Sequence, residues 1–293
     1  MKFKKYFLQL SLFLLPIISW SQNAYEYMGL VMLNDSTTIT YKISITEKNG
    51  SVKGYSLTDL GGEHETRSNI LGEYDHVNNE LNFRETSIIY TKSPVTQDDF
   101  CFINTTFKKF SFEKSNKIKA NFVGLFSDNT RCIDGQLFLN SVEKIEARMD
   151  KMVTKINKSN KIADSTKVKI NALRLMDSLN LNILKKDQTL SVFSKSKKVS
   201  IRVYDGGKED GDKITIYANK KVVLNNYEAN KEKRIIYLNL FDDKTSIVIK
   251  AENEGKITPN TVIVEIEDGN NNIKALSNLK QGETTQIDFL KAQ

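Results

Sequence analysis

The stretch TITYKISITEKNGSVKGYSLT, residues 38–58, alternates apolar and polar side chains on both sides of a Lys-Asn-Gly turn at 48–50. This alternation predicts two half-buried strands joined by a tight turn. Similar short runs continue along the chain, for example ELNFRETSIIY at 80–90, with Gly, Asn, Asp and Ser clusters between them. Roughly eight strands without a helix-length gap predict an antiparallel meander over residues 22–140. A closed barrel is its most economical form, because closure removes exposed sheet edges.

The N-terminal residues 1–21 have the three parts of a secretory signal peptide. The basic start MKFKK is followed by the apolar stretch YFLQLSLFLLPII and by small residues at Ser19 and Ser21. We predict cleavage after Ser21 and export to the periplasm or beyond the cell. The apolar stretch is shorter than the roughly 20 residues of a membrane span. No later segment is comparable, so the sequence predicts no transmembrane segment.

The two cysteines of the chain, Cys101 and Cys132, both lie late in the predicted meander. An even pair of cysteines in an exported chain favours a disulfide, which would tie two late strands together. Two separate buried thiols are the alternative. A catalytic thiol is disfavoured because only His64 and His76 are available as its base.

Residues 141–198 change to a helical period, with apolar residues at intervals of three and four. The first stripe comprises Val142, Ile145, Met149, Met152 and Ile156, and the second comprises Val168, Ala172, Leu173, Met176 and Leu179. We predict an antiparallel helical hairpin followed by a polar linker that ends at residue 198, with a continuous coiled-coil stalk as the alternative. Because two heptads per helix are few, packing against a domain or homo-oligomerisation through residues 141–182 is expected.

The net charge of +7 arises mainly in this middle segment, where residues 141–198 hold 14 basic and 6 acidic side chains. Lysines on the faces opposite an apolar stripe are typical of a solvated helix, and they also suit an anionic lipid or polysaccharide. An exported chain without interleaved arginine and aromatic residues is not expected to bind nucleic acid.

Strand periodicity returns in residues 199–293. Runs such as VSIRVYD, KITIYA, RIIYLNL and TVIVEIEDG make roughly seven short strands with turn residues between them. This number and rhythm predict a β-sandwich. The chain is therefore expected to be mainly β, with a helical hairpin between two β domains.

The loop DGGKEDGD, residues 205–212, places Asp205, Glu209, Asp210 and Asp212 among three glycines between two of these strands. Calcium takes six to eight oxygen ligands from a flexible loop, and glycine permits turns that bring carboxylates together. The loop is not an EF-hand, because an aspartate occupies the position of the required glycine. A calcium site is one interpretation, and an acidic turn exposed to solvent is the other.

A second loop, KAENEGKITPNT at 250–261, offers Asn253 and Asn260 as further oxygen donors. Together, the DGGKEDGD and NEGKITPNT stretches resemble the acidic loops of calcium-dependent β-sandwich carbohydrate-binding and accessory modules of exported proteins. The resemblance covers about residues 199–291 and implies a non-catalytic binding role with calcium as cofactor. The N-terminal meander is similar to lipocalin- and avidin-type barrels in architecture only.

Common enzyme signatures are absent from the sequence, which contains no HExxH, GxSxG, P-loop or GxGxxG motif. A glycosidase needs only two suitably spaced carboxylates. Candidates for such a pair are Glu63, Glu65, Glu73, Glu80 and Glu85. Because surface carboxylates on strands are far commoner than catalytic pairs, a carboxylate-dependent hydrolase is the weaker alternative.

The sequence thus predicts an exported, non-enzymatic protein that recognises a glycan or an envelope or extracellular protein through its C-terminal β domain, with calcium. A structural or assembly component of the cell envelope, which would oligomerise through the helical segment, is the second interpretation.

Overall fold

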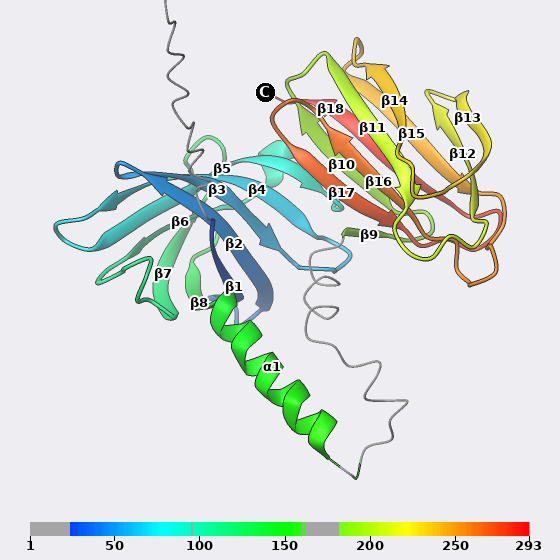
Figure 1. Ribbon diagram of the computed structural model, residues 1–293. Helices are drawn as coiled ribbons and strands as arrows, with labels where there is room; N and C mark the ends of the chain where they lie inside the picture. Colours follow the sequence, from blue (N-terminus) through cyan, green and yellow to red (C-terminus); the bar gives the residue numbers. More distant parts are fainter. Residues whose placement is uncertain (1–23, 95, 160, 162–181, 293) are drawn as a thin grey trace, which may run out of the picture.

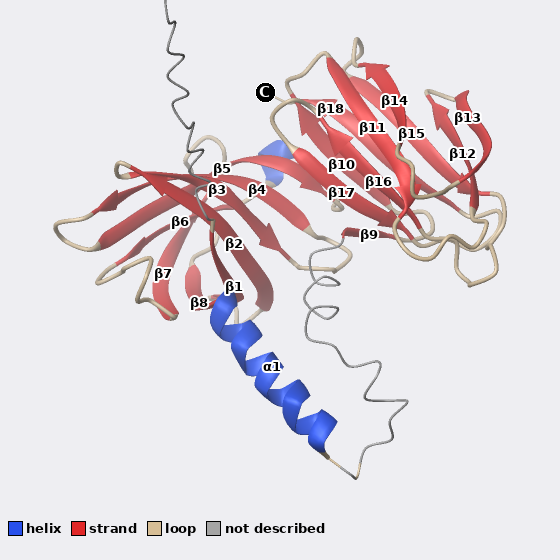
Figure 2. Cartoon of the chain, viewed as in Figure 1, coloured by secondary structure: helices blue, strands red, loops and turns tan. Residues whose placement is uncertain are grey.

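The computed structural model describes residues 24–94, 96–159, 161 and 182–292. In these residues β-strands dominate, together with one long α-helix and a short 3₁₀ turn (Figure 2). The first part of the chain contains β1 (Tyr25–Leu33), β2 (Thr38–Lys48), β3 (Ser51–Thr58), β4 (Thr66–Asp75), β5 (Glu80–Thr91), η1 (Gln97–Asp99), β6 (Phe102–Phe107), β7 (Lys117–Leu125) and β8 (Gly135–Ser141). The predicted mainly β fold is confirmed.

Strands β1 to β8 form a closed antiparallel barrel (Figure 1). Each strand pairs with the next along the chain, and β8 returns to pair with β1, from Tyr27 opposite Ser141 to Leu33 opposite Gly135. Strands β2 and β3 form the hairpin that the sequence predicts around Asn49. The barrel of eight antiparallel strands is therefore confirmed.

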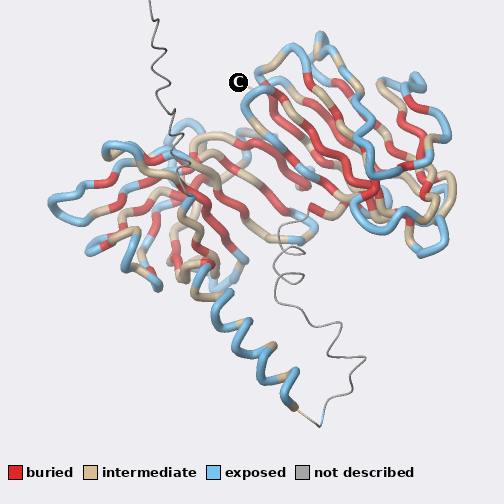
Figure 3. Tube along the Cα trace, in the orientation of Figure 1, coloured by how far each residue is buried: buried red, intermediate tan, exposed pale blue. Residues whose placement is uncertain are grey.

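Alternate residues of the barrel strands point inward and fill the core, as the buried segments in Figure 3 show. Tyr41 on β2 is completely buried, and Phe110 meets the rings of Tyr27, Tyr74 and Phe107 at centroid distances of 5.8, 6.0 and 6.2 Å. Each large apolar side chain removed from water contributes about 1.5–3 kcal/mol, so this aromatic cluster is a main source of barrel stability.

One carboxylate lies among these apolar side chains. Glu85 of β5 is 6% exposed, and its Oε1 accepts hydrogen bonds from Tyr41 Oη at 2.9 Å and Ser56 Oγ at 2.5 Å. Its Oε2 accepts one from the Ile103 main-chain N–H at 2.8 Å. Burial raises the pKa of Glu85 above its usual range, although these hydrogen bonds act in the opposite direction. A single side chain thereby ties β2, β3 and β6 to β5.

The predicted disulfide between Cys101 and Cys132 is present, with the two Cα atoms 6.0 Å apart. It joins the residue before β6 to the connection between β7 and β8. Such bonds persist in oxidising compartments, so the disulfide indicates an oxidising environment. The predicted signal peptide, residues 1–21, lies outside the described residues.

Helix α1 (Val142–Lys158) begins directly after β8, as predicted. Only Val142 is buried, and beyond its contacts with β1 and β8 the helix projects away from the barrel (Figures 1 and 3). Met152 of the predicted apolar stripe is 50% exposed. The second predicted helix falls at 162–181, outside the described residues. The described part of the chain contains one α-helix, α1, in place of the predicted hairpin. No helix in the described part is long and apolar enough to span a membrane.

The segment 141–198 was predicted as a helical hairpin and a polar linker, but residues 182–184 and 189–194 within it form two strands. Leu184, Leu190 and Val192 in these strands are completely buried. Runs of three to six residues between Lys-rich flanks carry little periodic signal, so the sequence pattern did not reveal them. The second part of the chain contains β9 (Asn182–Leu184), β10 (Thr189–Ser194), β11 (Lys198–Asp205), β12 (Lys213–Ala218), β13 (Lys221–Glu228), β14 (Arg234–Asn239), β15 (Lys244–Ala251), β16 (Val262–Glu267), β17 (Asn272–Ser277) and β18 (Thr284–Lys291).

Strands β9 to β18 form two facing layers. One layer, in the order β13-β12-β15-β18-β10, continues the barrel sheet because β10 pairs with the end of β5 at Tyr90 and Thr91. The other is a separate five-stranded sheet in the order β14-β11-β16-β17-β9. Most pairings are antiparallel, but β10 with β18 and β9 with β17 are parallel, so both layers are mixed.

One hydrophobic core fills the space between the layers and reaches the barrel. Buried apolar residues of both layers cluster with Leu57, Ile89 and Tyr90 of the barrel strands. The barrel and the second β unit therefore share a continuous sheet, and these three barrel residues extend the core between the layers, while the barrel interior has a separate core.

Candidate functional site

The predicted acidic loop lies at one end of the two layers, where the chain crosses from one layer to the other. Residues 206–212 connect β11 to β12, and residues 252–261 connect β15 to β16. Because β11 pairs antiparallel with β16 and β12 with β15, both connections fall at the same end. The strand pairing thus brings together two loops that are far apart in the sequence.

Four side-chain oxygens of these loops are buried and have no hydrogen-bond partner in the described structure. They are Asp205 Oδ2, Asp210 Oδ1, Asp212 Oδ1 and Asn260 Oδ1. Asp205, Asp212 and Asn260 are 2%, 1% and 0% exposed. An unpaired buried polar atom costs about 1–3 kcal/mol, and more when it is charged. A bound cation can satisfy buried acceptors without donors, and two of these four oxygens, Asp210 Oδ1 and Asp212 Oδ1, lie beside the same residue, Gly255.

Gly255 leaves a small space at which two of these oxygens point. A Cβ atom at Gly255 would lie 2.6 Å from Asp210 Oδ1 and 2.8 Å from Asp212 Oδ1, so any side chain there would fill the space. The second oxygen of each carboxylate is held by the 252–261 loop. The Ile257 N–H donates to Asp210 Oδ2 at 2.9 Å, and the Thr261 N–H donates to Asp212 Oδ2 at 2.7 Å.

The electrostatics of the site favour proton uptake or a cation. Burial raises the pKa of Asp212 to about 6, and the negative charges of Asp210, Asp205 and Glu254 act in the same direction. The hydrogen bond from the Thr261 N–H opposes this rise. With several carboxylates in one low-dielectric region, a positive charge lowers the free energy of the folded state.

Two of the six predicted ligands hold the loops together instead of pointing an unpaired oxygen into the site. Glu209 accepts a hydrogen bond from the Lys231 N–H at 2.5 Å, which ties the β13–β14 connection to the acidic loop. The Asn253 side chain bridges the two loops, because its Oδ1 accepts from the Lys213 N–H at 2.6 Å and its Nδ2 donates to the Gly211 carbonyl at 2.8 Å.

The structure also adds two residues that the sequence pattern did not single out. Gly255 forms the space beside Asp210 and Asp212, and its place in the sequence Asn253-Glu254-Gly255 was the available signal. Lys231 donates from Nζ to the main-chain oxygens of Asp205, at 3.3 Å, and Gly207. Its ammonium group therefore places a positive charge at the acidic loop, and nothing in its local sequence indicated this role.

The donor set suits calcium better than a transition metal. Within the described residues, no three Asp, Glu, His or Cys side chains converge closely enough to hold a metal ion by themselves. The oxygens available here come from carboxylates, from the Asn260 amide and from loop carbonyls, which are the mixed oxygen ligands that calcium accepts together with water. Zinc would require nitrogen or sulfur ligands in a tetrahedral arrangement.

The glutamates proposed for a hydrolase do not form a pair in a common cleft. Glu85 is enclosed in the barrel, and Glu65 is buried with its oxygens on Tyr90 Oη at 2.8 Å and the Gly61 N–H at 2.6 Å. Of the other three, Glu63 and Glu73 are exposed and Glu80 is half-exposed. Glu63 lines the cleft between the barrel and the second β unit, whereas Glu73 lines a groove on the barrel wall. This distribution does not favour the hydrolase interpretation.

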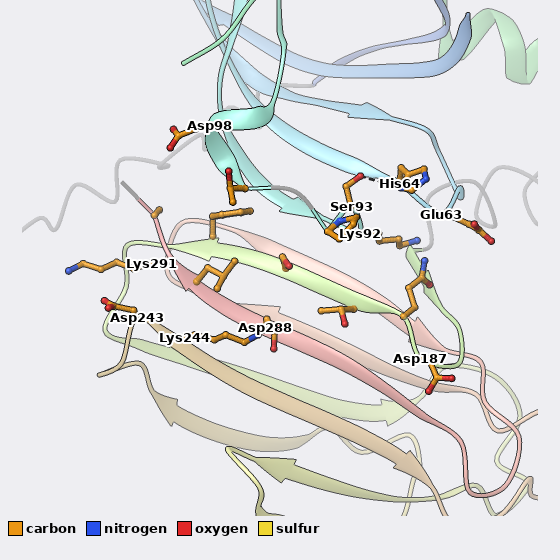
Figure 4. Close-up of a pocket in the computed structure, with 18 of the residues that line it drawn as sticks. Glu63, His64, Lys92, Ser93, Asp98, Asp187, Asp243, Lys244, Asp288 and Lys291 are labelled. Atoms are coloured by element: carbon orange, nitrogen blue, oxygen red, sulfur yellow. Dashed lines mark hydrogen bonds and ion pairs between the residues drawn. The ribbon is translucent and has the colours of Figure 1, made fainter. Parts of the chain in front are cut away.

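The cleft between the barrel and the second β unit has a volume of about 1080 Å³ (Figure 4). Charges of both signs line it, and Lys244 Nζ lies 2.7 Å from Asp288 Oδ2. Ser93 Oγ lies 3.3 Å from His64 Nδ1. In the described residues no carboxylate is hydrogen-bonded to the His64 ring, so the pair lacks the third group of a nucleophile, base and acid arrangement.

Neither a protein-family model, nor a curated protein, nor a solved structure matches this chain.

Proposed function

We propose that this chain is an exported, non-enzymatic binding protein in which calcium holds the loops of the second β unit and so shapes a surface that recognises a glycan or a protein. The observation that carries the proposal is the group of buried, unpartnered oxygens on Asp205, Asp210, Asp212 and Asn260. The disulfide and the predicted signal peptide support export to a compartment where calcium sites of modest affinity are filled.

The recognition surface in this proposal is the loop tip beside the site. Asp210 accepts two hydrogen bonds from the second loop, from the Lys256 N–H at 3.0 Å through its carbonyl and from the Ile257 N–H through its carboxylate. Ile257 is 54% exposed. A cation that fixes Asp210 therefore also fixes the exposed side chain of Ile257. In this way the cation influences the surface that a ligand would contact.

Calcium is expected to raise the thermal unfolding temperature of the protein, and a chelator is expected to reverse the shift. At a calcium concentration ten- to hundredfold above the dissociation constant, the gain is about 1.5–3 kcal/mol. Gly255→Ala fills the space between Asp210 and Asp212 and should abolish the shift. Calorimetry or circular dichroism of the purified protein measures it.

The matched control is Asp268→Asn. Asp268 is buried at the opposite end of the same layers, and its Oδ1 accepts hydrogen bonds from the N–H groups of Asn270 and Asn271 at 3.0 and 2.7 Å. This variant should lose some stability but keep the full calcium shift. An unchanged shift in Gly255→Ala, or no shift in the unmodified protein, would refute the calcium site.

Ligand binding is expected to require calcium. An array of glycans and a panel of envelope proteins, probed with the purified protein in calcium and in chelator, tests this expectation. Binding that is lost in chelator and in Gly255→Ala supports the proposal, whereas binding that is identical in both conditions contradicts the coupling between the cation and the surface.

A structural role in the cell envelope is the second candidate. Helix α1 favours it, because the helix projects from the barrel with Met149 and Ile156 half-exposed and Met152 50% exposed. An apolar stripe at this spacing suits a helical partner. Sedimentation velocity of Met152→Lys, on α1, and of Tyr237→Lys, on β14, separates assembly through the helix from assembly through the β-layers.

A further inference from the structure

Strand β14 is the free edge of the five-stranded sheet. In strand order it lies at the end opposite β9, while β13 is the corresponding edge of the other layer. The barrel joins the second unit through β10, at the far end of that layer. Strands β13 and β14 therefore lie on the flank away from the barrel, where nothing in the described structure covers them (Figure 1).

The side chains along this edge are unusually apolar for an exposed strand. Ile235 is 43% exposed, Tyr237 79% and Phe241 80%. On the neighbouring edge, Val222 and Val223 of β13 are 53% and 38% exposed. Exposed apolar residues that gather on a folded surface mark an interaction site, and Ile235 and Tyr237 lie on the same face of β14.

The main chain of β14 also has groups free for pairing. The Leu240 N–H donates to the Lys197 carbonyl at 2.8 Å and so continues the ladder with β11. In an antiparallel ladder the residues that face the partner alternate with residues that face away. The N–H and C=O groups of Ile235, Tyr237 and Asn239 consequently point to the open edge.

Natural proteins usually protect such an edge with a charged residue, a proline or a bulge. The stretch IIYLNLF, residues 235–241, contains no charged residue and no proline, and the pairing of β14 with β11 is without a bulge. An edge of this kind is suited to the addition of another strand.

The charges at the two ends of this stretch indicate which strand would pair with β14. Arg234 precedes it and Asp242 follows it, and neither makes an ion pair within the described residues. When two copies of the stretch lie antiparallel about Leu238, Arg234 of each copy stands opposite Asp242 of the other, and Ile235 stands opposite Phe241. The edge is therefore complementary to itself in both charge and hydrophobicity.

We propose that β14 pairs antiparallel with β14 of a second copy of this chain, so that the five-stranded sheets of the two copies form one continuous sheet. The outward main-chain groups of Tyr237 and Asn239 form the central hydrogen bonds, and the apolar side chains of the two copies cover one another. The interface lies on the flank opposite the barrel and is independent of calcium binding.

Sedimentation velocity of the purified protein over a concentration series tests the proposal through the dimer dissociation constant. Arg234→Asp alone places like charges opposite each other at both ends of the symmetric interface, and so does Asp242→Arg alone. Each variant is expected to weaken the dimer about tenfold or more, because opposed like charges on paired strands are destabilising. The double variant restores opposite charges and should return the dissociation constant close to its original value.

Further variants distinguish pairing through β14 from assembly through another surface, such as α1. Tyr237→Lys puts a charge at the centre of the edge and should give a monomer, whereas Val77→Lys, at a barrel turn that is 87% exposed, should leave the dimer unchanged. A protein that is monomeric at all concentrations overturns the proposal. A dimer that tolerates Tyr237→Lys but is lost with Met152→Lys on α1 also overturns it, because assembly then runs through the helix.

Discussion

Replacing Glu85 by alanine is expected to lower the free energy of unfolding by about 3–5 kcal/mol. The change removes the acceptor for Tyr41 Oη, Ser56 Oγ and the Ile103 N–H, all of which lie inside or beside the barrel core. Each donor left without a partner carries its desolvation cost, and the missing side chain leaves a cavity that the surrounding strands fill only in part.

Urea unfolding followed by circular dichroism measures this loss. Tryptophan fluorescence is unsuitable because the one tryptophan, Trp20, lies in the predicted signal peptide. Glu85→Gln keeps the size and one carbonyl acceptor, so its loss should be clearly smaller. Glu73→Ala, an exposed glutamate on β4, should change the free energy of unfolding by less than about 0.5 kcal/mol. A loss below about 1 kcal/mol for Glu85→Ala would show that Glu85 does not hold these strands together.

Replacing Asp212 by asparagine is expected to have opposite effects with and without calcium. In chelator at pH 8, the variant should be more stable than the unmodified protein by about 1–3 kcal/mol, because a buried negative charge is removed. In excess calcium the order should reverse, because the variant has lost a charged ligand while the unmodified protein gains the binding free energy.

The stability of the calcium-free protein is also expected to depend on pH, because the pKa of Asp212 is shifted. The sign of this shift again indicates that the negative charge of Asp212 destabilises the folded state. The pKa of Asp212 is raised from 3.8 to about 6 in the folded protein. The folded state therefore binds a proton more tightly than the unfolded state, and its stability falls as the pH rises through this interval. Thermal unfolding in chelator between pH 4 and pH 8 should show this fall in the unmodified protein and a smaller one in Asp212→Asn, with Asp268→Asn as the control.

A variant that is less stable than the unmodified protein both in chelator and in calcium would contradict this prediction. Asp212 would then serve only as the acceptor for the Thr261 N–H. The two measurements together separate a cation ligand from a purely structural carboxylate, because only the ligand gives a change of sign.

The acidic loop was predictable from its own residues, but the complete site was not. The sequence DGGKEDGD marked Asp205, Asp210 and Asp212 because several carboxylates among glycines are visible in a single stretch. Glu209 belongs to the same stretch and yet accepts a hydrogen bond from Lys231, which lies on another connection. Which carboxylate faces the site and which faces a neighbouring loop depends on main-chain direction, which composition does not reveal.

The strands of the barrel and those of the second unit differed in how well they could be predicted. The barrel strands run for six to twelve residues, and their alternation is clear in the sequence. Strand β9 has only three residues, too few to show an alternating pattern, and β10 follows it between Lys-rich flanks, so neither strand was predicted. Their partners stabilise them as strands, since β9 completes the sheet beside β17.

The sequence by itself determined the mainly β character, the strand order of the barrel and the start of α1, and it favoured the pairing of Cys101 with Cys132 that the structure shows. Each of these depends on a short-range periodicity or on the only available partner. The tertiary structure alone decided that Gly255 lies against Asp212, that the barrel and second unit share a sheet, and that β14 is left at a free edge. These features arise from pairing between segments far apart in the chain, where the packing free energy of the whole molecule selects the partner.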